Sequence, residues 1–534
     1  MSGAAVVPEA GSQLKRSSGD VLDFVSIRSS VGEITRQSAI YFASTIFALT
    51  CNYFFKIFIA RELGARLIGW NALGMGVYSI AKLAGQMGLP GSAVRFISAY
   101  RSTGDFDRLR GFFWRGLAWS LSGASFLAVG IVLLRHSLAV HLFHEPAMAA
   151  YLPLYAILVP LGIGSSFLGG TLRGFQKASR PAVIANFISL PVIIALSTAG
   201  VVLGFSLFAY VLAQVVGEFV SLILIAIELY KVSNGELRPR QHALQKIDRT
   251  ARSFALSFMG VGLIDFAANH ADRLVIGYFL DAKQVGVYAI ATSAGILVPM
   301  ILQAVNSVFS PMVSSLHSQN RQQLLAHLYQ VVTKWTLALT LPLVLVLVVF
   351  AVPFLSLFGT DFRSGWPILI VIAVAEIVDC GVGSVGVLLM MSGNEKRYIR
   401  TQAVLAPLIL AVKLALIPSL GLMGAALGSA LGIAASNLAY LWQVKKCLHM
   451  QPLNRGYFRL LGPVAMAALA VLFIRAAAGR IALPAAPSIL LALVSGYAAF
   501  LIPAIFALNQ EERSLARIAW QRTCSLLRLA PGIA

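Results

Sequence analysis

Apolar residues run along this chain in long blocks that short polar connections separate. A helix that crosses a bilayer needs about 20 mostly apolar residues, and blocks of that length recur between residues 37 and 508. The pattern predicts an all-α, polytopic membrane protein with about fourteen transmembrane helices. The predicted spans lie near residues 37–60, 66–90, 111–134, 150–172, 182–203, 206–229, 254–279, 285–309, 331–356, 366–392, 401–418, 422–444, 457–477 and 485–508.

One pattern within these blocks occurs twice, at residues 55–71 and 272–288. Each copy contains an apolar helix with a basic residue, a short polar step, and a second helix that opens with glycine and an aromatic residue. A shift of 217 residues carries Lys56 to Arg273. A repeat of about 200 residues is too long for a solenoid unit and has the length of half a transporter. The sequence therefore predicts a duplicated helical bundle.

The repeat predicts two pseudo-symmetric lobes of six helices each, followed by two further helices. The longest polar connection between spans falls where the repeat places the seam. The predicted parts are 1–35 as a cytoplasmic N-terminal tail, 36–230 as an N-lobe of spans one to six, 231–253 as a cytoplasmic linker, 254–447 as a C-lobe of spans seven to twelve, 448–508 as spans thirteen and fourteen, and 509–534 as a cytoplasmic C-terminal tail.

Composition and charge agree with a membrane protein. Of the 534 residues, 58% are hydrophobic and 12% are charged, whereas soluble domains carry about 25% charged residues. The net charge of +21 does not indicate nucleic-acid binding, because lysine and arginine gather in the cytoplasmic loops of membrane proteins. With a cytoplasmic N-terminus, the inside segments hold 31 of the 42 basic residues and the outside segments 7. This bias predicts that both termini are cytoplasmic.

Four basic residues remain within predicted spans, at a cost of roughly 2.5–3.5 kcal/mol each at the bilayer centre. They are Lys56, Lys82, Arg273 and Lys413. Lys82 shares one helical stripe with Asn71, Tyr78 and Gln86. Because such a stripe is too polar for lipid, we expect these cations to line a water-filled cavity that binds an anionic substrate. Lys413 lies near the outer end of its span, where it either lines the cavity or extends to the surface.

Acidic residues also occur within the spans, namely Glu218, Asp265, Asp272, Glu376 and Asp379. Asp265, Asn269 and Asp272 lie on one face of a helix, and Glu376 and Asp379 are three residues apart. Carboxylates at membrane depth are candidates for binding a coupling ion, H+ or Na+. For Asp272 the alternative is an ion pair with a lysine or arginine across the bundle.

Other motifs narrow the function further. His136, His141, His144 and Glu145 share one predicted outer loop, but their spacing matches no strong zinc pattern, so a solvated loop is favoured and no metal is expected. The sequence contains no Walker A motif, GxSxG elbow or HExxH pair. These absences argue against a primary pump and against most enzymes, and no cofactor is expected.

The hairpin at 272–288 resembles the start of the second lobe in Wzx-type polysaccharide flippases, which belong to the multidrug/oligosaccharidyl-lipid/polysaccharide (MOP) exporter superfamily. Residues 60–64 and 88–96 resemble first-lobe stretches of that family, and 174–177 resembles its turn after span four. The resemblance covers roughly residues 37–445.

This resemblance implies two lobes around a central cavity and transport by alternating access. The implied cargo is an isoprenoid-pyrophosphate-linked oligosaccharide, which moves from the cytoplasmic to the outer leaflet under an ion gradient or membrane potential. The resemblance further implies O-antigen or exopolysaccharide export in a bacterial cytoplasmic (inner) membrane, with membrane lipids and a glycan polymerase as partners. It implies a monomer that is neither an enzyme nor a nucleic-acid-binding protein.

Two other functions remain open. A MATE-like, cation-coupled drug exporter would favour acids and aromatic residues in its cavity, and acids are present within the spans. A membrane glycan polymerase or ligase would need a large outer loop with arginine and histidine, whereas the predicted loop at 135–149 is short.

Overall fold

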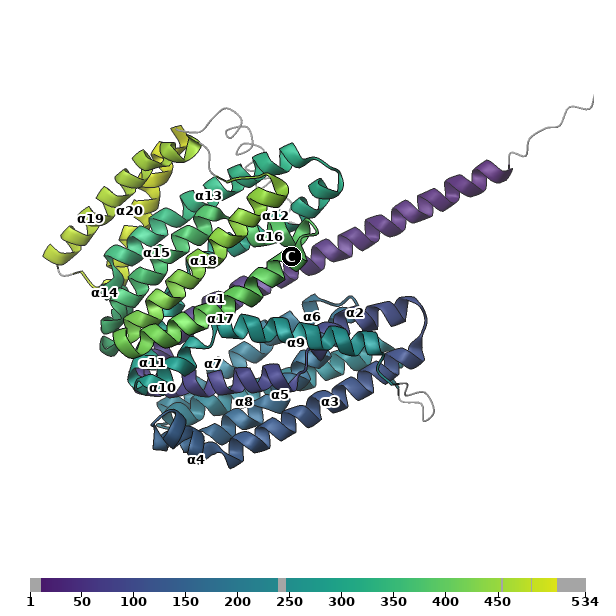
Figure 1. Cartoon of the computed structure of the whole chain (residues 1–534), viewed down its shortest axis with the longest axis horizontal. Helices are drawn as coiled ribbons and strands as arrows, with labels where there is room; N and C mark the ends of the chain where they lie inside the picture. Colours follow the sequence, from purple (N-terminus) through teal and green to yellow (C-terminus); the bar gives the residue numbers. More distant parts are fainter. Residues whose placement is uncertain (1–10, 239–245, 453–454, 482, 507–534) are drawn as a thin grey trace, which may run out of the picture. The chain divides into compact units, whose positions relative to one another are not determined.

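A computed structural model describes residues 11–238, 246–452, 455–481 and 483–506 of the chain. Within these ranges the chain is almost entirely helical and contains no strand (Figure 1), which confirms the all-α class. The predicted C-terminal tail at 509–534 lies outside the described residues, as do residues 1–10 of the predicted N-terminal tail and 239–245 of the predicted linker.

The helices follow one another through short turns. Up to residue 233 they are α1 (Gly11–Gly85), α2 (Leu89–Ser102), α3 (Phe106–Leu133), α4 (Arg135–Ser137), η1 (Leu138–Leu142), η2 (Pro146–Ala150), α5 (Leu152–Gly174), α6 (Ser179–Val183), η3 (Ile184–Ser189), α7 (Leu190–Val202) and α8 (Ser206–Ser233). From residue 249 they are α9 (Arg249–Asn269), α10 (Asp272–Phe279), α11 (Ala282–Gly295), α12 (Pro299–Ser318), α13 (Gln322–Val349), α14 (Ala351–Ser356), η4 (Thr360–Gly365), α15 (Trp366–Val382), α16 (Val385–Met391), α17 (Glu395–Leu420), α18 (Leu422–Leu448), η5 (Arg455–Leu460), α19 (Leu461–Arg480) and α20 (Ala485–Phe506).

Twelve of the described helical stretches are long and apolar enough to cross a membrane, or thirteen if the bent pair α11–α12 is one span. One of the twelve, Ala43–Ser102, contains 60 residues, which is far more than the roughly 20 that one crossing needs. Gly64 interrupts it with a φ of 72°, at the boundary between the first two predicted spans. The chain is therefore a multi-pass membrane protein, and the count of about fourteen spans stays a prediction.

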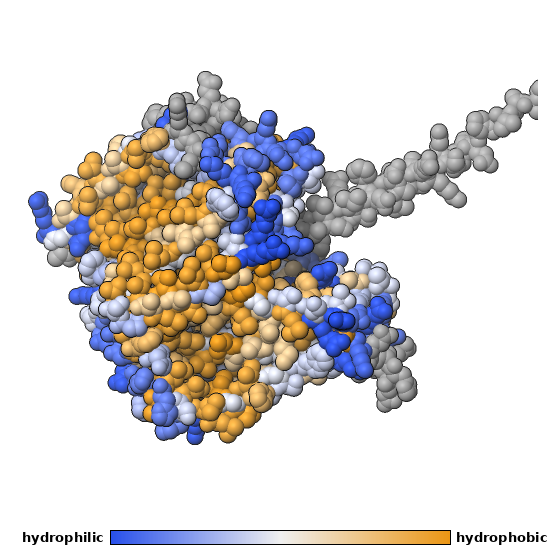
Figure 2. All heavy atoms as spheres, in the orientation of Figure 1, coloured by the Kyte–Doolittle hydropathy of each residue, from blue (hydrophilic) through white to orange (hydrophobic). Residues whose placement is uncertain are grey.

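The surface of the last two helices suits contact with lipid. Leu469 and Phe473 of α19 are 68% and 71% exposed, and Leu490 of α20 is 63% exposed. Figure 2 shows apolar side chains over much of these two helices. Because large exposed apolar surfaces are rare on soluble monomers, this surface agrees with the multi-pass assignment.

Contacts divide the chain into two compact units. The first comprises residues up to 56, 78–135 and 150–260, and the second comprises 57–77, 136–149 and the residues from 261 onward. All but the first two residues of the first repeated hairpin thus belong to the same unit as the second hairpin. This grouping follows contacts, so the sequence-based lobe boundaries at 36–230 and 254–447 stay a prediction.

Several predicted spans are broken. The span expected at 254–279 consists of α9 and α10, and α11 and α12 meet at a bend of 47° before Pro299. The span expected at 366–392 breaks at Gly383, whose φ is 74° and whose Cβ position would lie 2.3 Å from the Thr333 hydroxyl oxygen. Only glycine fits both this backbone angle and this close approach. Three of the predicted spans therefore contain a break or a sharp bend.

The two repeated hairpins contact each other through glycines that the 217-residue shift relates. A Cβ on Gly69 of α1 would lie 1.7 Å from the carbonyl oxygen of Ala282 in α11. Reciprocally, a Cβ on Gly286 of α11 would lie 1.9 Å from the carbonyl oxygen of Ala65 in α1. The two alanines are related by the same shift. The helices therefore meet backbone to backbone in an approximately two-fold arrangement.

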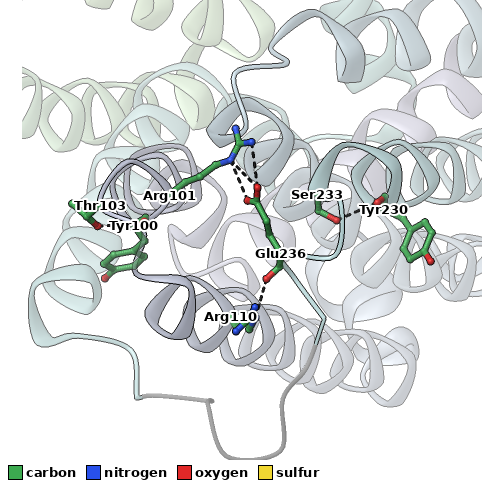
Figure 3. Close-up of polar contacts among 7 residues, drawn as sticks. All are labelled: Tyr100, Arg101, Thr103, Arg110, Tyr230, Ser233 and Glu236. Carbon is green, nitrogen blue, oxygen red and sulfur yellow. Dashed lines mark hydrogen bonds and ion pairs between the residues drawn. The ribbon is translucent and has the colours of Figure 1, made fainter.

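The chain that follows α8 is attached to the cytoplasmic ends predicted for α2 and α3 (Figure 3). The Glu236 carboxylate accepts a hydrogen bond from Arg101 Nε at 3.1 Å, and the Glu236 carbonyl accepts one from Arg110 Nε at 2.9 Å. Beyond the seven residues that are not described, the Tyr100 hydroxyl donates to Asp248 Oδ2 at 2.9 Å. Both described ends of the linker are thus attached to the last turn of α2.

We expect Gly69→Ala and Gly286→Ala each to lower the free energy of unfolding by about 1–3 kcal/mol, because the added methyl group meets a backbone carbonyl that cannot rotate away. Thermal unfolding of the detergent-solubilised protein measures this loss. Gly130→Ala in α3 is the control, because nothing lies within 4 Å of its Cβ position and alanine favours a helix. Equal unfolding temperatures for all three variants would contradict the close contact.

Candidate functional site

A cavity of about 660 Å³ lies within the second unit. Its walls come from the α9–α10 break and from α11, α12, α15, α16, α17 and α18. This volume is in the usual range for small-molecule sites, about 300–1,000 Å³. Six residues that the sequence singles out line it: Asn269, Asp272, Arg273, Glu376, Asp379 and Lys413.

The cavity extends along α17 and its antiparallel neighbour α18. Tyr398, Gln402, Ile409 and Lys413 of α17 line it at spacings of four, seven and four residues, which is one helical face. At a rise of 1.5 Å per residue this face is about 22 Å long. The Tyr440 hydroxyl of α18 donates to Gln402 Oε1, so aromatic and amide groups lie at one end of this face and Lys413 lies at the other.

Lys413 is buried at its end of the cavity, with 2% of its side chain exposed. Its Nζ lies 3.9 Å from Asp272 Oδ2 and donates to the carbonyl oxygen of Ala268 at 3.1 Å. A Cβ on Gly428 of α18 would lie 2.7 Å from Lys413 Cγ, so that glycine leaves room for the lysine stem. The expectation that Lys413 extends to the surface is therefore wrong, because a carboxylate partner and a small neighbour make burial favourable.

Asp272 connects this pair to two other helices. Its Oδ2 accepts a hydrogen bond from the Tyr288 hydroxyl at 2.8 Å, and its Oδ1 accepts one from the Arg273 backbone N–H at 3.0 Å. The Tyr288 hydroxyl also lies 3.1 Å from Ser429 Oγ. The structure thus contains the ion pair that the sequence offers as the alternative for Asp272. Each oxygen of this buried carboxylate thus accepts a hydrogen bond, as buried charges require.

Glu376 and Asp379 occupy successive turns of α15 and line the same cavity. Both are half-buried. Within the described ranges of the chain, no basic side chain lies within 4.0 Å of either carboxylate. In this respect these two acids differ from Asp272, which has Lys413 as a partner.

Asp265 does not line the cavity, although its neighbour Asn269 does. Asp265 is exposed and accepts a hydrogen bond from the Asn269 side-chain amide at 2.9 Å. This contact confirms that the two residues share a helix face. Because Asp265 does not line the cavity, it differs in position from Asp272, Glu376 and Asp379, which do.

The cations of the first repeat lie elsewhere. Lys82 is half-buried in the first unit, its Nζ lies 5.6 Å from the centre of the Tyr78 ring, and the Glu218 charge of α8 acts on it. Gln86, which directly follows α1, is half-buried in the same unit, whereas Asn71 of α1 is half-buried and belongs to the second unit. Lys56 is exposed. Arg273 and Lys413 line the described cavity, whereas Lys56 and Lys82 do not. A cavity shared by all four cations stays a prediction, because Lys56 and Lys82 belong to the first unit and Arg273 and Lys413 to the second.

Sequence reasoning missed several residues of the cavity, among them His270, Tyr288, Tyr398, Gln402 and Asn437. The stripe on α17 was a usable signal, because its polar members recur at helical spacing within an apolar segment. The break that brings His270 to the cavity has no comparable local signal.

In the predicted outer loop His136, His141 and His144 are exposed, as a solvated loop predicts, whereas Glu145 is buried. The Arg66 guanidinium pairs with Glu145 Oε2 at 2.8 Å, and the His144 ring lies 6.3 Å from the Tyr278 ring. In the part of the chain that the structure describes, no group of three or more potential ligands could hold a metal ion. Glu145 therefore has a structural partner.

Comparisons with known proteins agree with this architecture. The model of the polysaccharide biosynthesis protein family matches residues 34–317, and the model named MatE matches residues 258–377. The chain is 24% identical over 410 residues to the probable low-salt glycan biosynthesis flippase Agl15 of Haloferax volcanii, covering 76% of this chain and 83% of that protein.

Two solved structures share the fold. The lipid II flippase MurJ in an inward closed conformation has a TM-score of 0.66 at 14% identity, covering 88% of this chain and 98% of that one. An inward-facing multidrug resistance MATE transporter of the MOP superfamily has a TM-score of 0.59 at 16% identity, covering 74% of this chain and 94% of that one. At these identities the likeness concerns the fold alone.

We expect Asp272→Asn to lower the free energy of unfolding by about 3–5 kcal/mol, because it leaves the buried Lys413 ammonium without its carboxylate. The double variant Asp272→Asn/Lys413→Met should recover most of this loss, since it removes both charges. Thermal unfolding in detergent measures both effects.

The matched control is Asp361→Asn. Asp361 lies 3.6 Å from Lys283, but 46% and 57% of the two side chains are exposed, so its loss costs about 0–1 kcal/mol. If Asp272→Asn is no more destabilising than Asp361→Asn, the buried pair does not stabilise the fold.

Proposed function

Since this chain belongs to the polysaccharide biosynthesis protein family of the MOP exporter superfamily, we propose that it is a flippase for an isoprenoid-pyrophosphate-linked oligosaccharide. The cargo moves from the cytoplasmic to the outer leaflet by alternating access. The observation that carries this proposal is the family match over residues 34–317, which a glycan-flippase relative accompanies. The coarser conclusion, a multi-pass MOP flippase, does not depend on the identity of the cargo.

The chemistry of the cargo explains why cations are retained at membrane depth. A pyrophosphate is a compact anion that leaves water while its sugars cross the bilayer, and cations in a low-dielectric cavity attract it strongly. Arg273 lines the cavity of the second unit, and Lys82 is a half-buried cation within a predicted span of the first. Lys413 is already paired with Asp272, so Arg273 is the better candidate for the anion. The lipid tail stays in the bilayer.

A diffusible cation supplies the drive in this proposal. Glu376 and Asp379 are the coupling residues, because they line the cavity without a basic partner within 4.0 Å among the described residues. H+ or Na+ binds there, and one charge moving through 100 mV supplies about 2.3 kcal/mol. Asp265 has a lesser role, since it lies outside the cavity, and Asn269, which lines the cavity, carries no charge of its own.

The setting follows from the same proposal. The protein works as a single chain, with both termini cytoplasmic, in a bacterial inner membrane, and it passes its cargo to glycan polymerase machinery. It catalyses no covalent step. The relatives reported above are flippases and transporters by name, which supports this assignment over a membrane polymerase or ligase.

A cation-coupled drug exporter is the second candidate. The match of residues 258–377 to the MatE model favours it, as do the acids and tyrosines of the cavity, which could bind an organic cation. Drug resistance on overexpression, with normal glycan export after deletion, would favour the exporter over the flippase.

We expect the double variant Lys82→Ala/Arg273→Ala to lose glycan export by at least about tenfold, which corresponds to about 1.4 kcal/mol of lost anion attraction. Translocation of a lipid-linked oligosaccharide in reconstituted vesicles, or surface glycan in cells lacking the native gene, measures the loss. The control variant is Arg363→Ala, which changes an exposed cation outside the cavity. Unchanged export by the folded double variant would contradict a flippase that uses these cations.

We expect Glu376→Gln and Asp379→Asn to uncouple export from the ion gradient, because neither amide can bind and release a charge. In vesicles with an imposed gradient of H+ or Na+, the wild type should accelerate and both variants should not. Asp265→Asn is the matched control and should keep its response. Retained acceleration in both cavity variants would move ion coupling elsewhere.

A further inference from the structure

The Lys413 ammonium lies where two oxygen ligands converge inside the second unit. One is Asp272 Oδ2 at 3.9 Å, and the other is the carbonyl oxygen of Ala268 at 3.1 Å. Ala268 belongs to the last turn of α9, which ends at Asn269. Carbonyls in the last turn of a helix lack intrahelical donors and carry the negative end of the helix dipole. The ammonium thus donates a hydrogen bond to a carbonyl at the C-terminal end of α9.

Two further hydroxyl groups are linked by hydrogen bonds to the Asp272 carboxylate. The Tyr288 hydroxyl donates to the same Asp272 oxygen at 2.8 Å, and it lies 3.1 Å from Ser429 Oγ. Tyr288, Ser429 and Lys413 all line the cavity. A carboxylate, a carbonyl at a broken helix and nearby hydroxyls are the ligands by which membrane transporters bind Na+. The position therefore has the composition of a monovalent-cation site, although a side chain supplies its cation.

We propose that Lys413 is the resident cation of a built-in monovalent-cation site, and that truncation of Lys413 converts this position into a site for Na+. The proposal deepens the proposed function, because it concerns which carboxylates remain free for a coupling ion. A tethered ammonium cannot leave, so Asp272 cannot exchange cations during transport. Exchange is then confined to Glu376 and Asp379 in the same cavity.

The packing around the lysine supports a built site over an incidental pair. The lysine stem passes against Gly428, where a Cβ would lie 2.7 Å from Lys413 Cγ. The side chain is 2% exposed, so water does not compensate its charge. The carboxylate and the carbonyl must therefore balance the ammonium together, and both are left without a cation when the ammonium is removed.

The test compares cation binding by the purified full chain with and without the ammonium. Lys413→Ala removes the charge and leaves space for an ion, whereas Lys413→Met removes the charge and fills the space. Thermal unfolding is followed in NaCl, LiCl or KCl against choline chloride at equal ionic strength. Relative to the wild type, Lys413→Ala should gain an additional, saturable Na+-dependent rise in Tm on the order of 2 °C. Lys413→Met should gain none.

Asp272→Asn, alone and combined with Lys413→Ala, completes a double-mutant cycle. It should abolish the additional Na+ response in the Lys413→Ala background and leave the Na+ response of the wild-type background unchanged. Because the comparison uses the additional response, Na+ bound at Glu376 and Asp379 does not disturb it. Equal Na+ responses in Lys413→Ala and the wild type would overturn the proposal, and so would a wild-type response that Asp272→Asn removes.

A folding failure is also informative. If Lys413→Ala folds only when NaCl is present during purification, the metal ion replaces the ammonium as proposed. If it folds in none of the salts while Lys413→Met/Asp272→Asn does fold, Asp272 needs the lysine itself and the proposal is wrong. The measurement uses no lipid-linked glycan, so its failure is distinct from failure of the export assays.

Discussion

The reciprocal glycine contact between α1 and α11 is the constraint from which the second unit is built. At Gly69 and Gly286 the two repeated helices approach so closely that neither position can carry a side chain. Such an approach fixes both the distance and the angle between the helices, as small residues do in membrane bundles. α10 immediately precedes α11 in the chain, so this contact also determines where Asp272 and Arg273 enter the cavity. The duplicated pattern thus has a direct structural meaning: its two copies pack against each other.

Charge balance determines the chemistry of the cavity. Inside a bilayer each charge needs a charged partner or water. The carboxylates of the described cavity differ in whether they have a basic partner. Lys413 and Asp272 form a buried pair to which Tyr288 adds a hydrogen bond. Glu376 and Asp379 face the cavity and are half-buried. Two sets of acids on neighbouring helices therefore differ in what they can do, and the difference comes from one lysine on α17.

The sequence predicts the features that depend on composition and periodicity. Hydropathy predicts the all-α membrane class, and the repeat relates Lys56 to Arg273 before any contact is known. The environment of Lys413 was not predictable from the sequence. Lys413 is buried because Asp272 and Gly428 lie beside it, and Asp272 stands 141 residues earlier in the chain. Without these neighbours the side chain would extend to the membrane surface. The break between α9 and α10 has the same origin: no proline or glycine marks His270 and Ala271. At this break Lys413, from another helix, donates to the carbonyl of Ala268, a contact between residues 145 positions apart that no local pattern indicates.

The anchored linker has a mechanical consequence. Glu236 and Asp248 are both held by the last turn of α2, through Arg101 and Tyr100. The described residues on either side of 239–245 are therefore attached to α2. α9 starts at Arg249, one residue beyond an anchor, and continues as 21 helical residues. The residue that follows the anchor and the carbonyl of Ala268 that accepts from Lys413 thus lie at opposite ends of one uninterrupted helix, with no loop between them.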